Sequence, residues 1–306
     1  MTTLSQSAAP TAAAPSRLPD GAGRRRAGRR RIGRTTAYHL AIWVLGAIML
    51  YPGLWLLLSA FRPTNKIVGE TGLIPDDTTL DNFRTVFEGI GGVSFWTFFM
   101  NSVYLAVGSA VGVCLSCSLT AYAFSRIEFP GRGIFFTIMI GTLMLPFHVL
   151  IIPQFIMFNE IGWTDTYWPL LLGKFLAADA FFVFLMTQFM RTVPKSLDES
   201  ARIDGAGHLR IYWSIMLPLM RPVLATASIF AFIWSWNDFM GPLIYLRSPD
   251  KYPLPMMLRQ YADQTSTSDY GAQMAAALLA LAPVILFFVL FQRYIVEGVS
   301  TQGLRG

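Results

Sequence analysis

Charged residues are scarce in this chain. Of its 306 residues, 14% are Asp, Glu, Lys or Arg, whereas about 25% is ordinary for a soluble domain. Hydrophobic residues make up 54% of the sequence, and the mean hydropathy is +0.47. This balance excludes an ordinary soluble domain, and the sequence therefore predicts a membrane protein.

Cysteine and histidine are scarce too, and motifs of catalysis are missing. Cys114 and Cys117 stand three apart in one apolar run, where a disulfide would be strained. No histidine stands beside them to complete a metal site, so we expect two small packing residues. The chain has no G-x-x-x-x-G-K-[ST], no H-E-x-x-H and no G-x-S-x-G. The sequence predicts no catalytic residue, no metal, and no cofactor or ATP site in this chain.

Positive charge is concentrated in residues 1–36. This stretch holds eight arginines and one acid, a net +7, so that the rest of the chain carries −1 of the total of +6. Its Ala, Pro, Ser, Gly and Arg content predicts a disordered tail against anionic lipid headgroups. An arm that binds nucleic acid is the alternative, but we expect no nucleic-acid partner. The apolar run that follows is too long for a secretory signal.

Six apolar runs are long enough to cross about 30 Å of hydrocarbon. They are residues 37–61, 97–124, 133–158, 167–190, 222–246 and 273–292. With the N-terminus inside, the cytoplasmic segments hold 17 lysines and arginines and the outer loops hold 6. Positive loops face the cytoplasm. The predicted fold is an all-α polytopic membrane protein with six transmembrane helices in residues 37–306 and both termini cytoplasmic.

The loop of residues 194–222 faces the cytoplasm in this topology. Ser196–Glu199 has the spacing of a capping box, in which the serine oxygen accepts a backbone N–H and the glutamate reaches back. Asp204-Gly205 predicts a turn, because glycine tolerates positive φ. A short apolar segment, Ile211–Leu217, then runs into Pro218. We therefore expect a helix–turn–helix on this loop.

The loop also contains acidic and small residues, a turn and two prolines at fixed spacing: Glu199, Ser200, Ala201, Asp204, Gly205, Ala206, Ile215, Leu217, Pro218 and Pro222. With these residues it resembles the EAA loop of the inner-membrane permease subunits of bacterial ABC importers. Ser200 stands where the family usually has its middle alanine.

The resemblance implies an ABC importer permease core of type I in the bacterial cytoplasmic membrane. It also implies that the loop of residues 194–222 couples this chain to a separate ATPase, in whose groove it sits. The implied partners are a homologous second permease, an ATPase dimer that holds ATP and Mg, and an extracytoplasmic solute-binding protein.

Three charged residues interrupt the predicted spans, where charge is costly. Lys174 and Asp179 lie in the fourth span and Asp238 lies in the fifth. Lys174 is near the outer end, where its side chain can reach the headgroups. Asp179 is deeper, five residues further on, so on a regular helix it does not quite share the face of Lys174.

The fifth span contains Trp234-Ser235-Trp236-Asn237-Asp238, followed by Gly241-Pro242. This cluster resembles that of carbohydrate-uptake permeases, the family of the maltose system's second permease subunit. Aromatic faces stack on sugar rings, and amides and carboxylates bond sugar hydroxyls. The alternative is that Trp234, Trp236 and Asn237 are structural and cap a broken helix. The predicted substrate path comprises Asp179, Trp234, Trp236, Asn237, Asp238 and, more weakly, Asn101.

The sequence therefore predicts the permease subunit of an ABC importer for a sugar or an oligosaccharide. The same machinery for a polyol or glycerol phosphate is an alternative, although no clean anion pocket favours it. An ion-coupled secondary transporter would need charged relays and inverted halves.

In the outer loop of residues 62–96 a short amphipathic segment either contacts the binding protein or forms a lid. Small residues four apart, Gly108 and Gly112, predict close helix packing.

Overall fold

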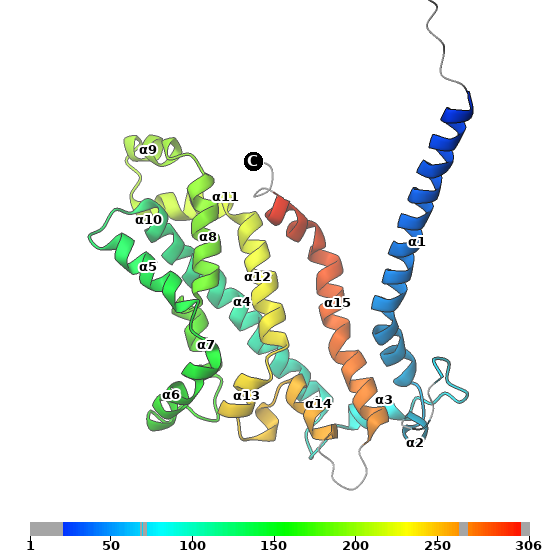
Figure 1. Cartoon of the computed structure of the whole chain (residues 1–306). Helices are drawn as coiled ribbons and strands as arrows, with labels where there is room; N and C mark the ends of the chain where they lie inside the picture. The colour runs from blue at the N-terminus through cyan, green and yellow to red at the C-terminus, as the bar shows by residue number, and fades with distance from the viewer. Residues whose placement is uncertain (1–20, 68, 70–71, 263–268, 301–306) are drawn as a thin grey trace, which may run out of the picture. The chain divides into compact units, whose positions relative to one another are not determined.

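The chain is helical almost throughout. The computed structural model describes residues 21–67, 69, 72–262 and 269–300, in which an isolated bridge between Ile90 and Val93 is the only β pairing (Figure 1). These residues belong to two compact units, residues 1–55 and 56–306. Each unit is described by itself below.

The first unit contains most of α1, Gly21–Ser59, a helix of 39 residues with Pro52 inside it. Its segment Tyr38–Ser59 is long and apolar enough to cross a membrane, which confirms the first predicted span. In this structure residues 21–36 of the predicted tail continue this helix. Alanine and arginine favour helices, and no proline stands between Pro19 and Pro52. Residues 1–20 of the predicted tail lie outside the described residues.

The second unit is a helical bundle around α4. Its elements are α2 Thr64–Ile67, α3 Asp81–Glu88, α4 Phe95–Arg126, α5 Arg132–Thr142, α6 Phe147–Glu160, α7 Trp168–Phe175, α8 Ala180–Thr192, α9 Ser196–Ile203, α10 His208–Ile211, the π-helix Tyr212–Met216, α11 Leu217–Leu219, α12 Arg221–Trp236, α13 Met240–Tyr245, the 3-10 helix Pro249–Lys251, α14 Leu254–Ala262 and α15 Tyr270–Ser300. Helix α4 packs most extensively against α12, α8 and α7.

Two apolar clusters form the core of this unit, and α4 contributes to both. One cluster joins the middle of α4 to α8, the π-helix and α12, with Met186, Met190 and Met216 fully buried. The other joins the start of α4 to α3, α14 and α15. Cys117 is fully buried in the first cluster and Cys114 is half-buried, and both are free thiols. The expectation that they are packing residues is therefore confirmed.

The predicted spans are confirmed in part. In addition to Tyr38–Ser59, three more segments are long and apolar enough to cross a membrane: Phe95–Arg126, Trp168–Thr192 and Tyr270–Phe291. For the fifth span, α12 passes this test only together with the segment His208–Leu219, from which it is bent by 77°. The described residues thus contain four spans, or five if the bent pair is counted.

The third predicted span is not one continuous helix. Helix α5 ends at Thr142, and α6 begins at Phe147 directly after Pro146. Proline has no N–H to donate and disfavours helix in the residue before it. The expected interruption at Pro146 is confirmed, whereas Pro153 lies inside α6.

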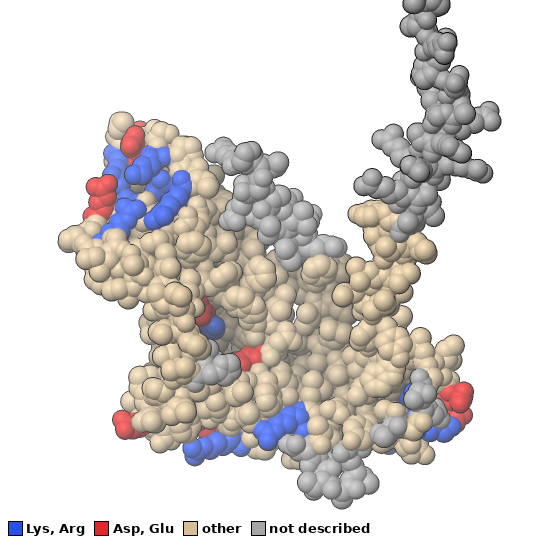
Figure 2. All heavy atoms as spheres, viewed as in Figure 1, with Lys and Arg blue, Asp and Glu red and all other residues tan. Residues whose placement is uncertain are grey.

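Charge in the second unit is separated into two regions. On the face in Figure 2, charged side chains gather around α9 and along the opposite edge, where α6, α13 and α14 lie, with a largely uncharged surface between them. An uncharged band between charged ends is what a bilayer requires. In the loop of residues 62–96, α3 packs against α15, and the amide of Asn82 donates to the carbonyls of Ala60 and Arg62. The predicted amphipathic segment is therefore a packed helix.

Helices α4 and α7 approach closely at the small residues of α4. A Cβ at Gly108 would lie 3.2 Å from the Leu171 side chain. A Cβ at Gly112 would lie 3.0 Å from the Phe175 ring and 3.1 Å from the backbone carbonyl carbon of Lys174. The second contact involves backbone, which cannot rotate away. The predicted close packing at Gly108 and Gly112 is therefore confirmed.

We expect Gly112→Ala to destabilise the chain, because the added methyl group would force α4 and α7 apart. Overpacking of this kind costs about 1–3 kcal/mol. The matched control is Gly133→Ala in α5, where an added Cβ meets nothing within 4 Å. Thermal unfolding in detergent should show a lower Tm for Gly112→Ala and an unchanged or higher Tm for Gly133→Ala. Equal Tm shifts in the two variants would contradict the packing argument.

Candidate functional site

The site begins at a break in the fourth span. Helix α7 ends at Phe175, α8 begins at Ala180, and Ala177 between them has a φ of +55°. A helix end in a membrane leaves backbone groups that water cannot reach. Ser116 of α4 bonds two of them: its hydroxyl donates to the Lys174 carbonyl at 2.6 Å and accepts from the Ala177 N–H at 3.2 Å. One serine thus stabilises both sides of the break.

The break brings Lys174 and Asp179 together. The ammonium of Lys174 lies 2.8 Å from Oδ2 of Asp179, and the two side chains are 28% and 31% exposed. The expectation that they do not quite share a face assumed a regular helix, and the structure has a break between them instead. The left-handed conformation of Ala177 turns the chain back between them. An ion pair thus lies at the centre of a predicted span.

A cavity of about 230 Å³ lies beside this ion pair. It opens between α4, α7, α12 and the start of α13. The Ser109 hydroxyl donates to that of Ser235 at 3.1 Å. The residues that line it are Leu105, Ser109, Leu170, Lys174, Trp234, Ser235, Asp238 and Pro242. The cavity thus offers an indole, two hydroxyls, a cation and a carboxylate, which are the groups that bind a polyhydroxylated ring.

Two of the predicted path residues line this cavity, and a third, Asp179, is paired with a lining residue. Trp234 lines it, is 48% exposed and packs against Phe181 and Phe182 of α8. Asp238 lines it and accepts a hydrogen bond at 3.1 Å from the backbone N–H of Gly241. Asp179 reaches it through its ion pair with Lys174. Their role in substrate transfer stays a prediction.

The other three predicted path residues make structural contacts. Trp236 is 3% exposed and donates its indole N–H to the Ala280 carbonyl at 3.1 Å. Asn237 donates to the Ile233 carbonyl at 2.8 Å, at the C-terminal end of α12. Asn101 donates to the carbonyls of Asp250 and Tyr252. For Trp236 and Asn237 these contacts fit the structural alternative, in which they stabilise a break before Pro242.

Sequence reasoning missed the residues that assemble the cavity. Ser109, Ser235 and Ser116 were not singled out, and Lys174 was assigned to the headgroups. The sequence did indicate that Ser116 shares a helix face with Gly112 and Gly108, because the three residues are spaced by four. Residues four apart share a helix face. Nothing in the sequence marks Ala177 as the break, since the residues 176–179 contain neither glycine nor proline.

The loop of residues 194–222 forms the predicted helix–turn–helix, but its capping box is absent. Lys195 already has helical φ and ψ and is the N-cap of α9, which has no side-chain cap bond. Ser196 therefore lies inside the first turn, where its side chain cannot act as a cap. The turn is confirmed, because Gly205 has a φ of +81°. Pro218 does not end the second arm, which continues through the π-helix and α11 to Leu219.

The predicted coupling residues are partly exposed on this loop. Glu199, Ser200, Asp204 and Gly205 are exposed, whereas Ala201 is buried. Ile203 and Leu209 are 87% and 71% exposed. Ala206, Leu217 and Pro218 are the remaining predicted residues; Ala206 and Leu217 pack partly against the core cluster of α4 and α8. Their coupling role stays a prediction.

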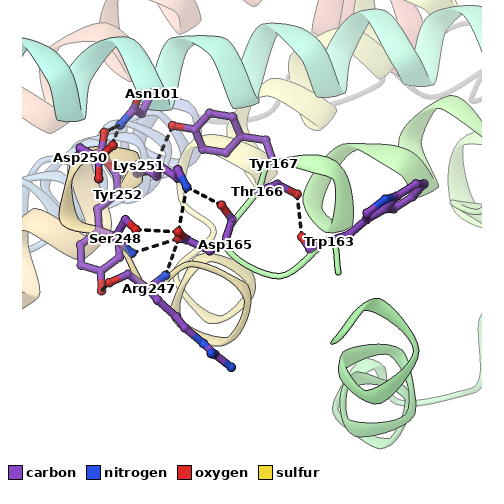
Figure 3. A network of polar contacts seen from close by, with 10 residues as sticks. All are labelled: Asn101, Trp163, Asp165, Thr166, Tyr167, Arg247, Ser248, Asp250, Lys251 and Tyr252. Atoms are coloured by element: carbon purple, nitrogen blue, oxygen red, sulfur yellow. Dashed lines mark hydrogen bonds and ion pairs between the residues drawn. The ribbon is translucent and has the colours of Figure 1, made fainter. Parts of the chain in front are cut away.

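Two loops, one before α7 and one after α13, are joined by a polar network centred on Asp165 (Figure 3). Its carboxylate accepts bonds from the backbone N–H groups of Arg247 and Ser248, from the Ser248 hydroxyl at 2.6 Å and from the Lys251 ammonium at 2.8 Å. Asp165 has a φ of +59°, which aspartate tolerates better than most residues. Burial alone would raise the pKa of Asp165, but these hydrogen bonds outweigh burial and hold its pKa well below the ordinary value.

We expect Asp165→Asn to lower the stability of the chain at pH 7 by about 1 kcal/mol, because the hydrogen bonds to a charged acceptor are lost. A lowered folded-state pKa contributes stability above the ordinary pKa of about 3.9 and loses it as the pH falls below that value. The difference in Tm between the variant and the wild type should therefore be largest above about pH 5 and decrease toward pH 2. Asp76→Asn, at an exposed acid of the outer loops, is the control. A difference that persists unchanged at low pH would contradict this account.

Comparisons with known proteins agree on one family. Residues 112–301 match the family described as binding-protein-dependent transport system inner membrane component. The arabinooligosaccharides transport system permease protein of Halalkalibacterium halodurans is 35% identical over 85% of this chain and 92% of its own. A diacetylchitobiose uptake system permease protein of Streptomyces coelicolor is 33% identical over 87% of this chain and 88% of its own.

A solved structure has the same fold. It is that of a bacterial ABC transporter involved in the import of the acidic polysaccharide alginate. The TM-score is 0.75 at 25% identity, over 87% of this chain and 97% of that one. These matches lead to one assignment: the chain belongs to the inner membrane components of binding-protein-dependent transport systems, the permease subunits of ABC importers.

Proposed function

We propose that this chain moves a sugar or an oligosaccharide across the bacterial cytoplasmic membrane as one permease of an ABC importer. The observation that carries this proposal is the cavity in which the Trp234 indole stands beside Lys174, Ser109 and Asp238. An aromatic face with hydroxyl, amine and carboxylate groups around it suits a sugar. The named relatives for arabinooligosaccharides and diacetylchitobiose support the same substrate class.

The ion pair of Lys174 with Asp179 favours a neutral substrate. The Lys174 ammonium is 2.8 Å from a carboxylate, and Asp238 adds a second carboxylate to the cavity. This chain therefore contributes no excess positive charge to the cavity. Because glycerol phosphate or an acidic sugar would need such a charge, we favour a neutral sugar.

The rest of the importer lies on other chains in this proposal. A homologous second permease completes the pathway, an ATPase dimer holds ATP and Mg, and an extracytoplasmic protein delivers the solute. This chain then has six spans and both termini in the cytoplasm. The exposed Glu199, Ser200 and Ile203 of α9 would enter the ATPase groove. ATP binding closes the ATPases, and the attached coupling loops move so that the cavity faces outward.

The substrate role of the cavity is tested by Trp234→Ala. In proteoliposomes that hold the whole importer, loss of the stacking surface should lower the transport kcat/KM about tenfold, which corresponds to ~1.4 kcal/mol. Trp234→Phe keeps an aromatic face and should retain most of the activity. Trp43→Ala, at an exposed tryptophan of α1, is the control. Uptake of a panel of radiolabelled neutral sugars, driven by ATP, is the measurement, and normal uptake by Trp234→Ala would contradict the assignment.

The coupling role of the loop is tested at Gly205. Its φ of +81° is closed to proline, whose ring fixes φ near −65°. Gly205→Pro should leave insertion in the membrane intact but abolish ATP-driven transport, whereas Gly205→Asn should retain most of it, because asparagine tolerates positive φ. Membrane fractionation and uptake are measured on both variants. Transport by Gly205→Pro at the wild-type rate would exclude the coupling role.

A further inference from the structure

The cytoplasmic end of α4 is joined to α9 by a buried ion pair. Nε of Arg126, the last residue of α4, lies 3.2 Å from Oδ2 of Asp198 in α9, and their side chains are only 3% and 8% exposed. The same guanidinium donates through Nη2 to the carbonyls of Met190 at 2.9 Å and Val193 at 2.7 Å, at the end of α8. A single side chain therefore contacts α4, α8 and α9.

A contribution to the stability of the fold does not by itself account for this buried ion pair. A buried ion pair repays the loss of water poorly compared with well-packed apolar residues. Here the pairing is also incomplete, because Nε of Arg126 and Oδ1 of Asp198 are both buried without a hydrogen bond in the part of the chain that the structure describes, so that the 3.2 Å contact is an ion pair only. What such a pair does provide is a defined position, since the planar fork of arginine bonds several acceptors in fixed directions.

The second arm of the coupling loop is also bonded to α4. The hydroxyl of Tyr122 lies 3.2 Å from Nδ1 of His208, at the start of α10. The hydroxyl of Ser118 lies 2.7 Å from that of Tyr212, in the π-helix. Ser118, Tyr122 and Arg126 are spaced by four and therefore follow one face of α4. Both arms of the loop are thus attached to the same helix.

Helix α4 also reaches the cavity. Its Ser116 bonds the break between α7 and α8, and Ser109 lines the cavity. Any displacement of α4 must therefore move groups beside the Lys174–Asp179 ion pair. A rigid helix that contacts both sites is a physical link between them, provided that its attachment to the loop does not slip.

We propose that Arg126 is a positioning residue of the importer: it fixes α9 to α4 and α8, so that movement of the coupling loop is passed to the cavity. This inference rests on the proposed function. It assigns to Arg126 and Asp198 the conversion of ATP hydrolysis into transport, and it assigns them no contact with the solute or with ATP.

The test measures solute moved per ATP hydrolysed by the complete importer in proteoliposomes. Arg126→Met leaves Asp198 without its partner, and we expect this ratio to fall about tenfold. The double variant Arg126→Met/Asp198→Leu replaces the pair with apolar groups, so that no buried charge is unpaired. It should assemble and unfold as the wild type does, yet keep the low ratio. Arg126→Lys, which keeps the charge but loses the fork, should lie between.

Arg132→Met is the matched control, because Arg132 lies just beyond α4 and its guanidinium donates to the Ile127 carbonyl. Its ratio should equal that of the wild type. A double variant with a wild-type ratio would overturn the proposal and leave the ion pair a role in stability only.

Hydrogen exchange of the same importer separates this inference from the proposed function. Amides of residues 196–203 should exchange roughly tenfold faster in the double variant, and those of α4 should be unchanged. Unchanged exchange at residues 196–203 would overturn the role of Arg126 whatever the solute is. Faster exchange in an importer that transports no sugar would support the role of Arg126 and reject the substrate assignment.

Discussion

The fold depends on one constraint: inside a membrane, every backbone polar group at a helix break must find a partner within the protein. Ser116 meets this requirement between α7 and α8 by bonding a carbonyl on one side and an N–H on the other. Without that hydroxyl these two backbone groups would lose the partner that α4 provides. On a continuous helix Lys174 and Asp179, five residues apart, would lie on different faces, so their ion pair depends on the break.

Helix α4 supplies partners on two of its faces. The face of Gly108, Gly112 and Ser116 lies against α7 and the break. The face of Ser118, Tyr122 and Arg126 contacts the two arms of the loop of residues 194–222. Both sets are spaced by four residues, which is the helical repeat of contacts. The cavity and the loop are therefore attached to one helix.

Hydropathy and the residue types of the loops predicted those features of the fold that depend on the local sequence. The spans at α4 and α15 follow from apolar length, and the turn at Gly205 follows from its missing Cβ. The break at Ala177 could not be predicted, because its stabilising partner, Ser116, is some 60 residues away in the sequence. The capping box failed for a related reason: the chain is already helical at Lys195, and only the three-dimensional context decides where a helix begins.

The neighbouring acids of α9 show how far residue type alone can mislead. Asp198 and Glu199 both suit the first turn of a helix, where the dipole favours negative charge. They differ by about 100° around the helix axis, so Asp198 is buried against Arg126 while Glu199 is exposed. One acid thus makes a contact within the chain, and the other faces away from it. The loop of residues 194–222 therefore has an inner and an outer face, and two adjacent carboxylates lie on different sides of it.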